Sequence, residues 1–168
     1  MKSEESVRHS RAKSENQGVP EGAERPVFAD IMTLQRIGNL LSRPFFQQYA
    51  KRHNLTLNEW RVVVVAHDRP GTAGHEVGRF AGLIPMNVSR AVASLKSAGR
   101  IRAETDPENR RQQSLYLTEE GELLFEQIYP KARAHAERLF EVFNTQERQQ
   151  FSDMLQRLYR RAEDVLGD

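Results

Sequence analysis

The chain has 168 residues, a formal net charge of +2 and no cysteine. Its length is typical of one domain, and the lack of cysteine excludes a disulfide framework, a thiolate zinc site and a cysteine nucleophile. No apolar stretch approaches the roughly 18 to 20 residues that span a bilayer, and Met1–Arg25 has no apolar core like that of a secretory signal. We therefore expect a cytoplasmic protein with no membrane partner.

The first 26 residues carry few apolar side chains and alternate Lys, Arg, Glu, Ser, Asn and Gly. Such a segment buries too little apolar surface to offset the entropy lost on ordering. We therefore predict a disordered tail over residues 1–26 and a single domain over residues 27–168. An alternative is a basic arm that follows DNA, although five basic residues are balanced there by five acidic ones.

A long amphipathic helix is predicted from Val27, because apolar residues recur at separations of three, four or seven residues. These residues are Ile31, Leu34, Leu41, Phe45 and Tyr49. Pro44 removes one backbone donor and clashes with the preceding turn, so we expect a kink or break near Leu40–Arg43.

A second helix is predicted to begin at Thr56-Leu57-Asn58-Glu59, which has the form of a capping box. The following run Val62-Val63-Val64-Val65 favours a strand by propensity, but the capping signal favours a helix. Asp68-Arg69-Pro70-Gly71 then predicts a turn.

Two short helical segments follow, over His75–Leu83 and around Val88–Leu95. A helix-turn-helix needs small residues where its two helices approach and a glycine at the turn. Gly78 and Gly82 meet these needs. Gly99 tolerates left-handed geometry and is predicted to end the second helix.

The outer face of this second helix is small, polar and basic. Because Val88, Ala91, Val92 and Leu95 point inward, the predicted DNA contacts are Pro85, Met86, Asn87, Ser89, Arg90, Ser94 and Lys96. Asn87 and Arg90 suit adenine and guanine, each through two hydrogen bonds. The two serines and Lys96 suit phosphate, which fixes register without reading sequence. The alternative is a solvated surface on an ordinary helical hairpin.

A β-hairpin with a charged tip is predicted next, from two short alternating segments, Ile101–Thr105 and Ser114–Leu117. Asn109, Arg110 and Arg111 lie near its tip, where guanidinium groups can enter a minor groove or hold phosphates. We expect Asp106 to bond one of these arginines and to support the loop. The alternative is a plain charged turn.

Two further helices complete the chain. Thr118-Glu119-Glu120 places a cap and two carboxylates at the positive end of a helix that we expect to continue to Phe143, with a bend at Pro130. A final helix is predicted to open near Asn144–Glu147. Its apolar residues at helical spacing are Phe151, Met154, Leu155, Leu158 and Val165.

Between Phe28 and Glu163 the sequence resembles the MarR family of bacterial regulators. The residues that carry the resemblance are Leu55-Thr56 with Trp60, Ser89-Arg90-Ala91-Val92 with Leu95 and Gly99, Asp106–Arg111, and Leu115–Gly121. The resemblance implies an obligate homodimer formed by the first and last two helices, which binds a palindromic operator in double-stranded DNA. Gly78 replaces the usual alanine and Arg100 a frequent leucine, so we expect looser local packing at both positions.

The family resemblance also implies a small aromatic acid or phenol as a ligand that lowers DNA affinity. The predicted lining combines aromatic surface with a guanidinium that can meet a carboxylate; it consists of Phe45, Phe46, Tyr49, His53, Trp60 and Arg61. The alternative is that these aromatic residues belong to the core and that Arg61 is a surface residue.

The predicted fold class is therefore mainly α with a small β-hairpin wing. We expect dimerisation helices at about residues 27–53 and 119–166 and a DNA-binding lobe at about residues 55–118. The predicted function is a repressor released from its operator by an aromatic ligand; the alternative is a constitutive architectural or adaptor dimer without an effector. We predict no enzyme activity, no cofactor and no metal, since Arg79 stands where a zinc-protease helix with His75-Glu76 would need a second histidine.

Overall fold

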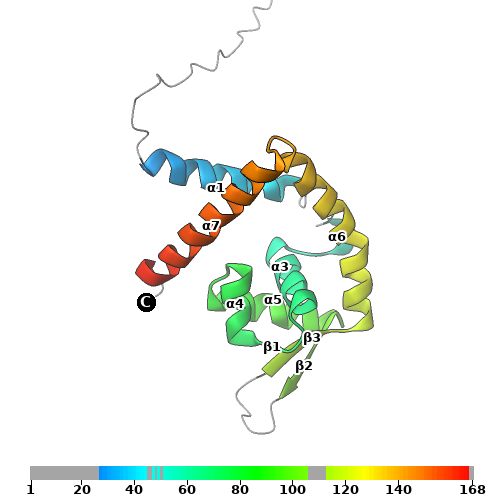
Figure 1. Cartoon of the computed structure of the whole chain (residues 1–168). Helices are drawn as coiled ribbons and strands as arrows, with labels where there is room; N and C mark the ends of the chain where they lie inside the picture. The colour runs from blue at the N-terminus through cyan, green and yellow to red at the C-terminus, as the bar shows by residue number, and fades with distance from the viewer. Residues whose placement is uncertain (1–26, 45–46, 48, 50, 106–112, 167–168) are drawn as a thin grey trace, which may run out of the picture. The chain divides into compact units, whose positions relative to one another are not determined.

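The computed structural model describes residues 27–44, 47, 49, 51–105 and 113–166. The chain divides into two compact units, residues 1–37 and 38–168. The described part of the first unit belongs to helix α1 (Val27–Pro44), and all other elements lie in the second unit (Figure 1). The mainly helical fold with a small antiparallel sheet confirms the predicted fold class. The predicted tail over residues 1–26 lies outside the described residues, and the predicted single domain over residues 27–168 stays a prediction.

Helix α1 ends at Pro44 and is continuous up to that residue. The regular α-helix is therefore interrupted at Pro44, one residue after the range Leu40–Arg43 in which a kink or break was predicted. A proline in the last helical position costs one hydrogen bond at the end of the helix rather than in its interior. A short helix, α2 (Lys51–His53), precedes the main body of the second unit.

Helix α3 (Leu57–Asp68) forms the centre of the second unit. Its predicted capping box is confirmed: the Thr56 backbone N–H donates to Glu59 Oε2 at 2.6 Å, and the Glu59 N–H donates to Thr56 Oγ1 at 3.2 Å. Val62 and Val63 are fully buried. Because α3 is covered by helices and by the sheet, burial outweighs the strand propensity of its valines.

Helices α4 (Gly74–Ala81) and α5 (Pro85–Ser97) form the predicted helix-turn-helix. Gly82 ends α4 with φ of 64°, in the left-handed region that favours glycine. Gly99, with φ of 70°, follows α5 as predicted. Its amide donates to the Lys96 carbonyl at 3.0 Å, which closes the helix end.

The expectation of looser packing at Gly78 is wrong. A Cβ at Gly78 would lie 2.8 Å from the Leu83 carbonyl oxygen and 3.3 Å from Val88 Cγ2. The missing side chain therefore permits a closer approach of α4 to the turn and to α5. Arg100 is also well held, since its guanidinium donates to the His53 carbonyl at 2.6 Å and to the Asn54 carbonyl at 3.3 Å.

The sheet has three strands in the order β1-β3-β2, all antiparallel. Strand β2 (Ile101–Thr105) has its predicted bounds, and β3 (Gln113–Leu117) begins one residue earlier than predicted. Ile101 pairs with Leu117, and Thr105 pairs with Gln113. Strand β1 (Thr72–Ala73), which pairs with β3, was not predicted.

The two long C-terminal helices are α6 (Glu119–Phe140) and α7 (Thr145–Leu166). Helix α6 is capped by Thr118, runs through Pro130 and ends before Phe143, so the predicted extension to Phe143 is wrong. A capping box at the start of α7 separates the two helices. The Asn144 amide donates to Glu147 Oε2 at 2.8 Å, and the Glu147 amide donates to Asn144 Oδ1 at 3.0 Å.

Candidate nucleic-acid interface and ligand cavity

Helix α5 separates apolar and polar side chains as the sequence predicted. Val88, Ala91 and Leu95 are buried against the rest of the second unit. Of the seven residues of α5 predicted to contact DNA, six are exposed and Asn87 is half-buried. The structure therefore brings the predicted set onto one accessible surface, and their contact with DNA stays a prediction.

The N-terminal end of α5 is electropositive. Pro85 occupies its first turn, the N-cap residue Ile84 supplies no side-chain hydrogen bond, and the helix contains no acidic residue. Arg90 and Lys96 add two positive charges along the exposed side. Because the positive end of the helix dipole attracts anions, this surface suits the phosphates and acceptor-rich base edges of DNA.

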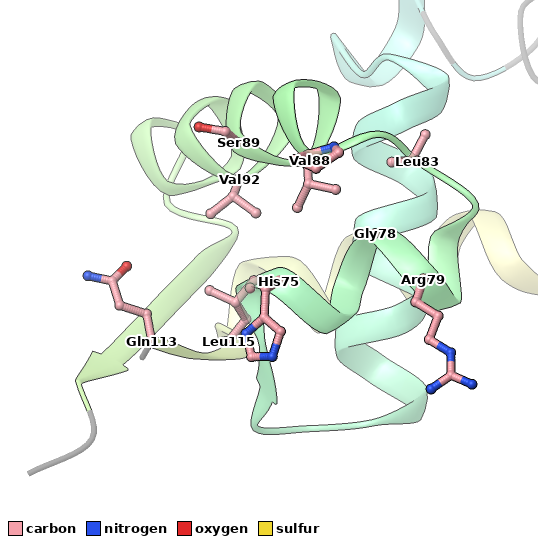
Figure 2. Close-up of a pocket in the computed structure, with 11 residues that line it drawn as sticks. His75, Gly78, Arg79, Leu83, Val88, Ser89, Val92, Gln113 and Leu115 are labelled. Atoms are coloured by element: carbon pink, nitrogen blue, oxygen red, sulfur yellow. The ribbon is translucent and has the colours of Figure 1, made fainter. Parts of the chain in front are cut away.

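A cleft of about 470 Å³ separates α5 from α4 and β3. Figure 2 shows Val88 and Val92 pointing from α5 toward α4, whereas Arg79 on α4 points away from α5. His75 and Gln113 line the cleft together with Ser89 from the predicted interface. Gln113 was not predicted to contact DNA, although it is an exposed polar residue at the end of the predicted hairpin tip.

The predicted wing is formed by β2 and β3, but its tip is not described. Asp106, Asn109, Arg110 and Arg111, predicted to form or support the tip, lie outside the described residues. At the base of the hairpin, the Arg102 guanidinium lies 4.5 Å from the centre of the Tyr116 ring and pairs with Glu104. Arg102 is thus held against the sheet by two neighbours.

A second cavity, of about 290 Å³, lies where α1, α3 and α6 meet within the second unit. Tyr49, Trp60 and Arg61 of the predicted ligand site line it. The alternative prediction was that these aromatic residues belong to the core. It holds for Tyr49 and Trp60, which are part of the buried core. Phe45 and Phe46 lie outside the described residues.

The cavity also contains residues that the sequence did not indicate. His135 and Ala132 of α6 join Gly38, Leu41 and Ser42 of α1 and Leu57 of α3. His53, which was predicted here, is not among the lining residues; its carbonyl instead receives the Arg100 guanidinium. Burial lowers the pKa of His53 below its usual value, and the charges of Arg52, Arg100 and Lys131 lower it further.

The aromatic side of this cavity continues into a stack between α3 and α6. The ring of Phe125 stacks on Trp60 at 5.9 Å, on His67 at 3.6 Å and on Tyr129 at 4.6 Å between ring centres. His67 Nδ1 also lies 2.8 Å from Glu122 Oε2. The wall formed by Trp60 is therefore fixed in position by its neighbours.

Over the described ranges, no helix is long and apolar enough to cross a membrane. Within the same part of the chain, no three His, Cys, Asp or Glu side chains gather closely enough to hold a metal ion.

Comparison with known proteins finds similarity to bacterial regulators. No protein-family model matches the chain. The homoprotocatechuate degradative operon repressor of Escherichia coli is 23% identical over 128 residues, which cover 74% of this chain and 86% of that protein.

Solved structures match over most of both chains. A MarR/EmrR family transcriptional regulator from Acinetobacter sp. ADP1 has a TM-score of 0.74 and 22% identity, with 83% of this chain and 98% of that chain covered. NadR in complex with 4-hydroxyphenylacetate has a TM-score of 0.70 and 19% identity, with 84% and 98% covered. The chain therefore has the winged helix-turn-helix fold of the MarR-family transcriptional regulators, which confirms the resemblance that its sequence indicates.

Proposed function

We propose that the protein is a sequence-specific transcriptional repressor that acts in the cytoplasm as a homodimer on palindromic DNA, and that it is not an enzyme. The observation that carries this proposal is the exposed, acid-free outer surface of α5 in a winged helix-turn-helix. The repressor from Escherichia coli supports it, since that relative matches most of this chain.

In this proposal some residues of α5 contact bases and others contact phosphates. Asn87 and Arg90 read base edges, and Ser89, Ser94 and Lys96 hold phosphates, while Pro85 and Met86 fit the groove at the helix start. Asn109, Arg110 and Arg111 contact DNA from the wing, with Asp106 as support. The cleft beside Ser89 leaves room between α5 and the strand that leads to this wing.

The proposed dimer uses the apolar surface of the terminal helices. Met154, Leu158 and Val165 of α7 are exposed by 56%, 53% and 55%, and apolar residues of α1 are also exposed. An apolar surface of this kind marks an interaction site. A second copy suits it, because a two-fold dimer presents two α5 helices to two half-sites of a palindrome.

The proposed effector is a small aromatic acid or phenol in the cavity between α1, α3 and α6. Trp60 and Tyr49 supply aromatic surface, and Arg61 supplies a guanidinium for a carboxylate. NadR, of the same fold, has been solved with 4-hydroxyphenylacetate. The effector lowers DNA affinity only if it binds the DNA-free arrangement more tightly than the DNA-bound one.

The experiment that tests the DNA assignment maps the binding sites of the protein on the genome of its source and then measures binding to one of these fragments. Arg90→Ala should weaken binding by at least about fivefold and relax base preference at one position of each half-site. Lys96→Ala should weaken binding to all sequences and lower the dependence on salt. Arg138→Ala, at an exposed arginine of α6, is the matched control. Wild-type affinity of both α5 variants would contradict the assignment.

A further inference from the structure

Helices α4 and α7 are joined by one carboxylate. Arg79 of α4 donates from Nε to Glu163 Oε1 at 2.8 Å and from Nη2 to Glu163 Oε2 at 3.4 Å. Tyr159, one turn earlier on α7, donates its hydroxyl to the same Oε1 at 3.0 Å. That hydroxyl also lies 3.5 Å from the Arg79 carbonyl. The Glu163 carboxylate therefore accepts hydrogen bonds from Arg79 of α4 and from Tyr159 of its own helix, α7.

The pair is ionised at neutral pH. Hydrogen bonds from Arg79 and then from Tyr159 lower the pKa of Glu163, and the hydrogen bond to Glu163 raises the pKa of Arg79. The Arg79 side chain is 67% exposed, so the pair contributes little to folding stability. Its two-point geometry nevertheless restricts how α4 can lie against α7.

The position of α4 determines the position of the recognition helix. The Leu83 amide donates to the Gly78 carbonyl at 2.8 Å, and the missing side chain of Gly78 lets Val88 of α5 approach. Because Arg79 follows Gly78 and points away from α5 (Figure 2), it can hold α7 without disturbing this contact. Because α4 contacts α5 through Gly78, a change in the position of α4 relative to α7 also changes the position of α5 relative to α7.

Helix α7 is part of the proposed dimer interface, so its contact with α4 has a consequence for DNA. A dimeric helix-turn-helix protein binds two half-sites whose centres are about 10 to 10.5 base pairs apart, or a multiple of this. We propose that Glu163 is a positioning residue for DNA recognition, which holds Arg79 and thereby fixes the separation of the two α5 helices to match one half-site spacing. This inference rests on the proposed function.

The test measures binding of the full chain to duplexes that carry the same half-sites at different spacings. The series runs from about one base pair shorter to about two base pairs longer than the preferred spacing. Wild type should prefer one spacing by at least about fivefold, as expected for a typical coupling. Glu163→Ala should bind the neighbouring spacings within about twofold of the preferred one.

Matched variants separate positioning from other effects. Asp164→Ala removes an exposed carboxylate next to Glu163 and should keep the wild-type spacing profile. Arg90→Ala should weaken binding at every spacing and leave the profile unchanged. The charge-swapped variant Arg79→Glu/Glu163→Arg should restore a sharp profile. If Glu163→Ala does not fold, as judged by its thermal transition, Glu163→Gln replaces it, since glutamine keeps the size and loses the charge.

The outcomes are distinguishable. A sharp wild-type profile that Glu163→Ala or its replacement retains would overturn the role of Glu163 and leave the proposed function intact. The role of Glu163 would also be overturned if Glu163→Ala lost the preference for one half-site spacing and the charge-swapped variant did not restore it. A wild-type protein that binds no duplex specifically would instead contradict the proposed function on which the inference rests.

Discussion

Gly121 lies against the Arg100 carbonyl so closely that no side chain fits between them: a Cβ at Gly121 would overlap that oxygen. This contact joins the first turn of α6 to the turn that follows α5. The Thr118 hydroxyl donates to the neighbouring Gly99 carbonyl at 2.6 Å and accepts from the Gly121 amide at 3.1 Å. The junction between the DNA-binding lobe and α6 is therefore set by backbone contacts that admit only glycine at position 121.

Gly121→Ala should destabilise the protein by about 1 to 3 kcal/mol, because the new methyl group must displace backbone rather than a flexible side chain. Gly74→Ala is the control: it also lies in the first turn of a helix, and nothing surrounds its Cβ position within 4 Å. Urea denaturation of both variants measures the difference. Equal free energies of unfolding for the two variants would contradict this description of the junction.

A larger side chain in the proposed ligand cavity should abolish the response to aromatic acids. Ala132→Leu fills part of the space beside Trp60 and Arg61 but lies far in sequence from α5. With 4-hydroxyphenylacetate as the probe, wild type should show a raised melting temperature and release from DNA, since a ligand that binds the folded state stabilises it. The variant should need at least about tenfold more ligand and should bind DNA as wild type does.

Ala134→Leu, at an exposed position of the same helix, is the control and should respond as wild type. An unchanged response of Ala132→Leu would show that the ligand binds elsewhere. If neither this probe nor other aromatic acids and phenols affect the wild-type protein, the effector is contradicted, and the constitutive architectural or adaptor dimer becomes the better description.

Acid should destabilise the fold partly through His53. Its pKa is lowered in the folded protein, chiefly by burial and then by Arg52, Arg100 and Lys131, so the unfolded chain binds the proton more tightly. The contribution of neutral His53 is therefore complete above its usual pKa of 6.5 and is lost as the pH falls toward the lowered value. Denaturation of wild type and His53→Gln between about pH 8 and about pH 5 measures it. The wild-type protein should lose more stability on acidification; equal losses would show that His53 contributes nothing.

Local signals in the sequence were sufficient for much of the fold. The capping residues Thr56 and Glu59 are three positions apart, and Gly99 marks a helix end through its own backbone conformation, so each can be recognised without knowledge of the tertiary structure. The sidedness of α5 follows in the same way from the spacing of Val88, Ala91 and Leu95.

Long-range contacts could not be predicted in this way. Strand β1 has only two residues, Thr72 and Ala73, and exists because β3 pairs with it. Arg79 and Glu163 are 84 positions apart, and no spacing rule connects them. His135 reaches the cavity from α6, whereas His53, which lies closer in sequence to Trp60, is not among the lining residues. In each case the packing of distant elements decides the outcome.

Sequence-specific recognition of a palindrome can be tested by selecting bound duplexes from a random DNA library with the full chain. We expect successive rounds to enrich an inverted repeat whose half-site centres are about one helical turn apart. Arg90→Ala should lose the base preference at one position in both half-sites while retaining the symmetry. If the wild-type protein enriches no sequence, or enriches a single site without two-fold symmetry, it does not recognise a palindrome as a dimer.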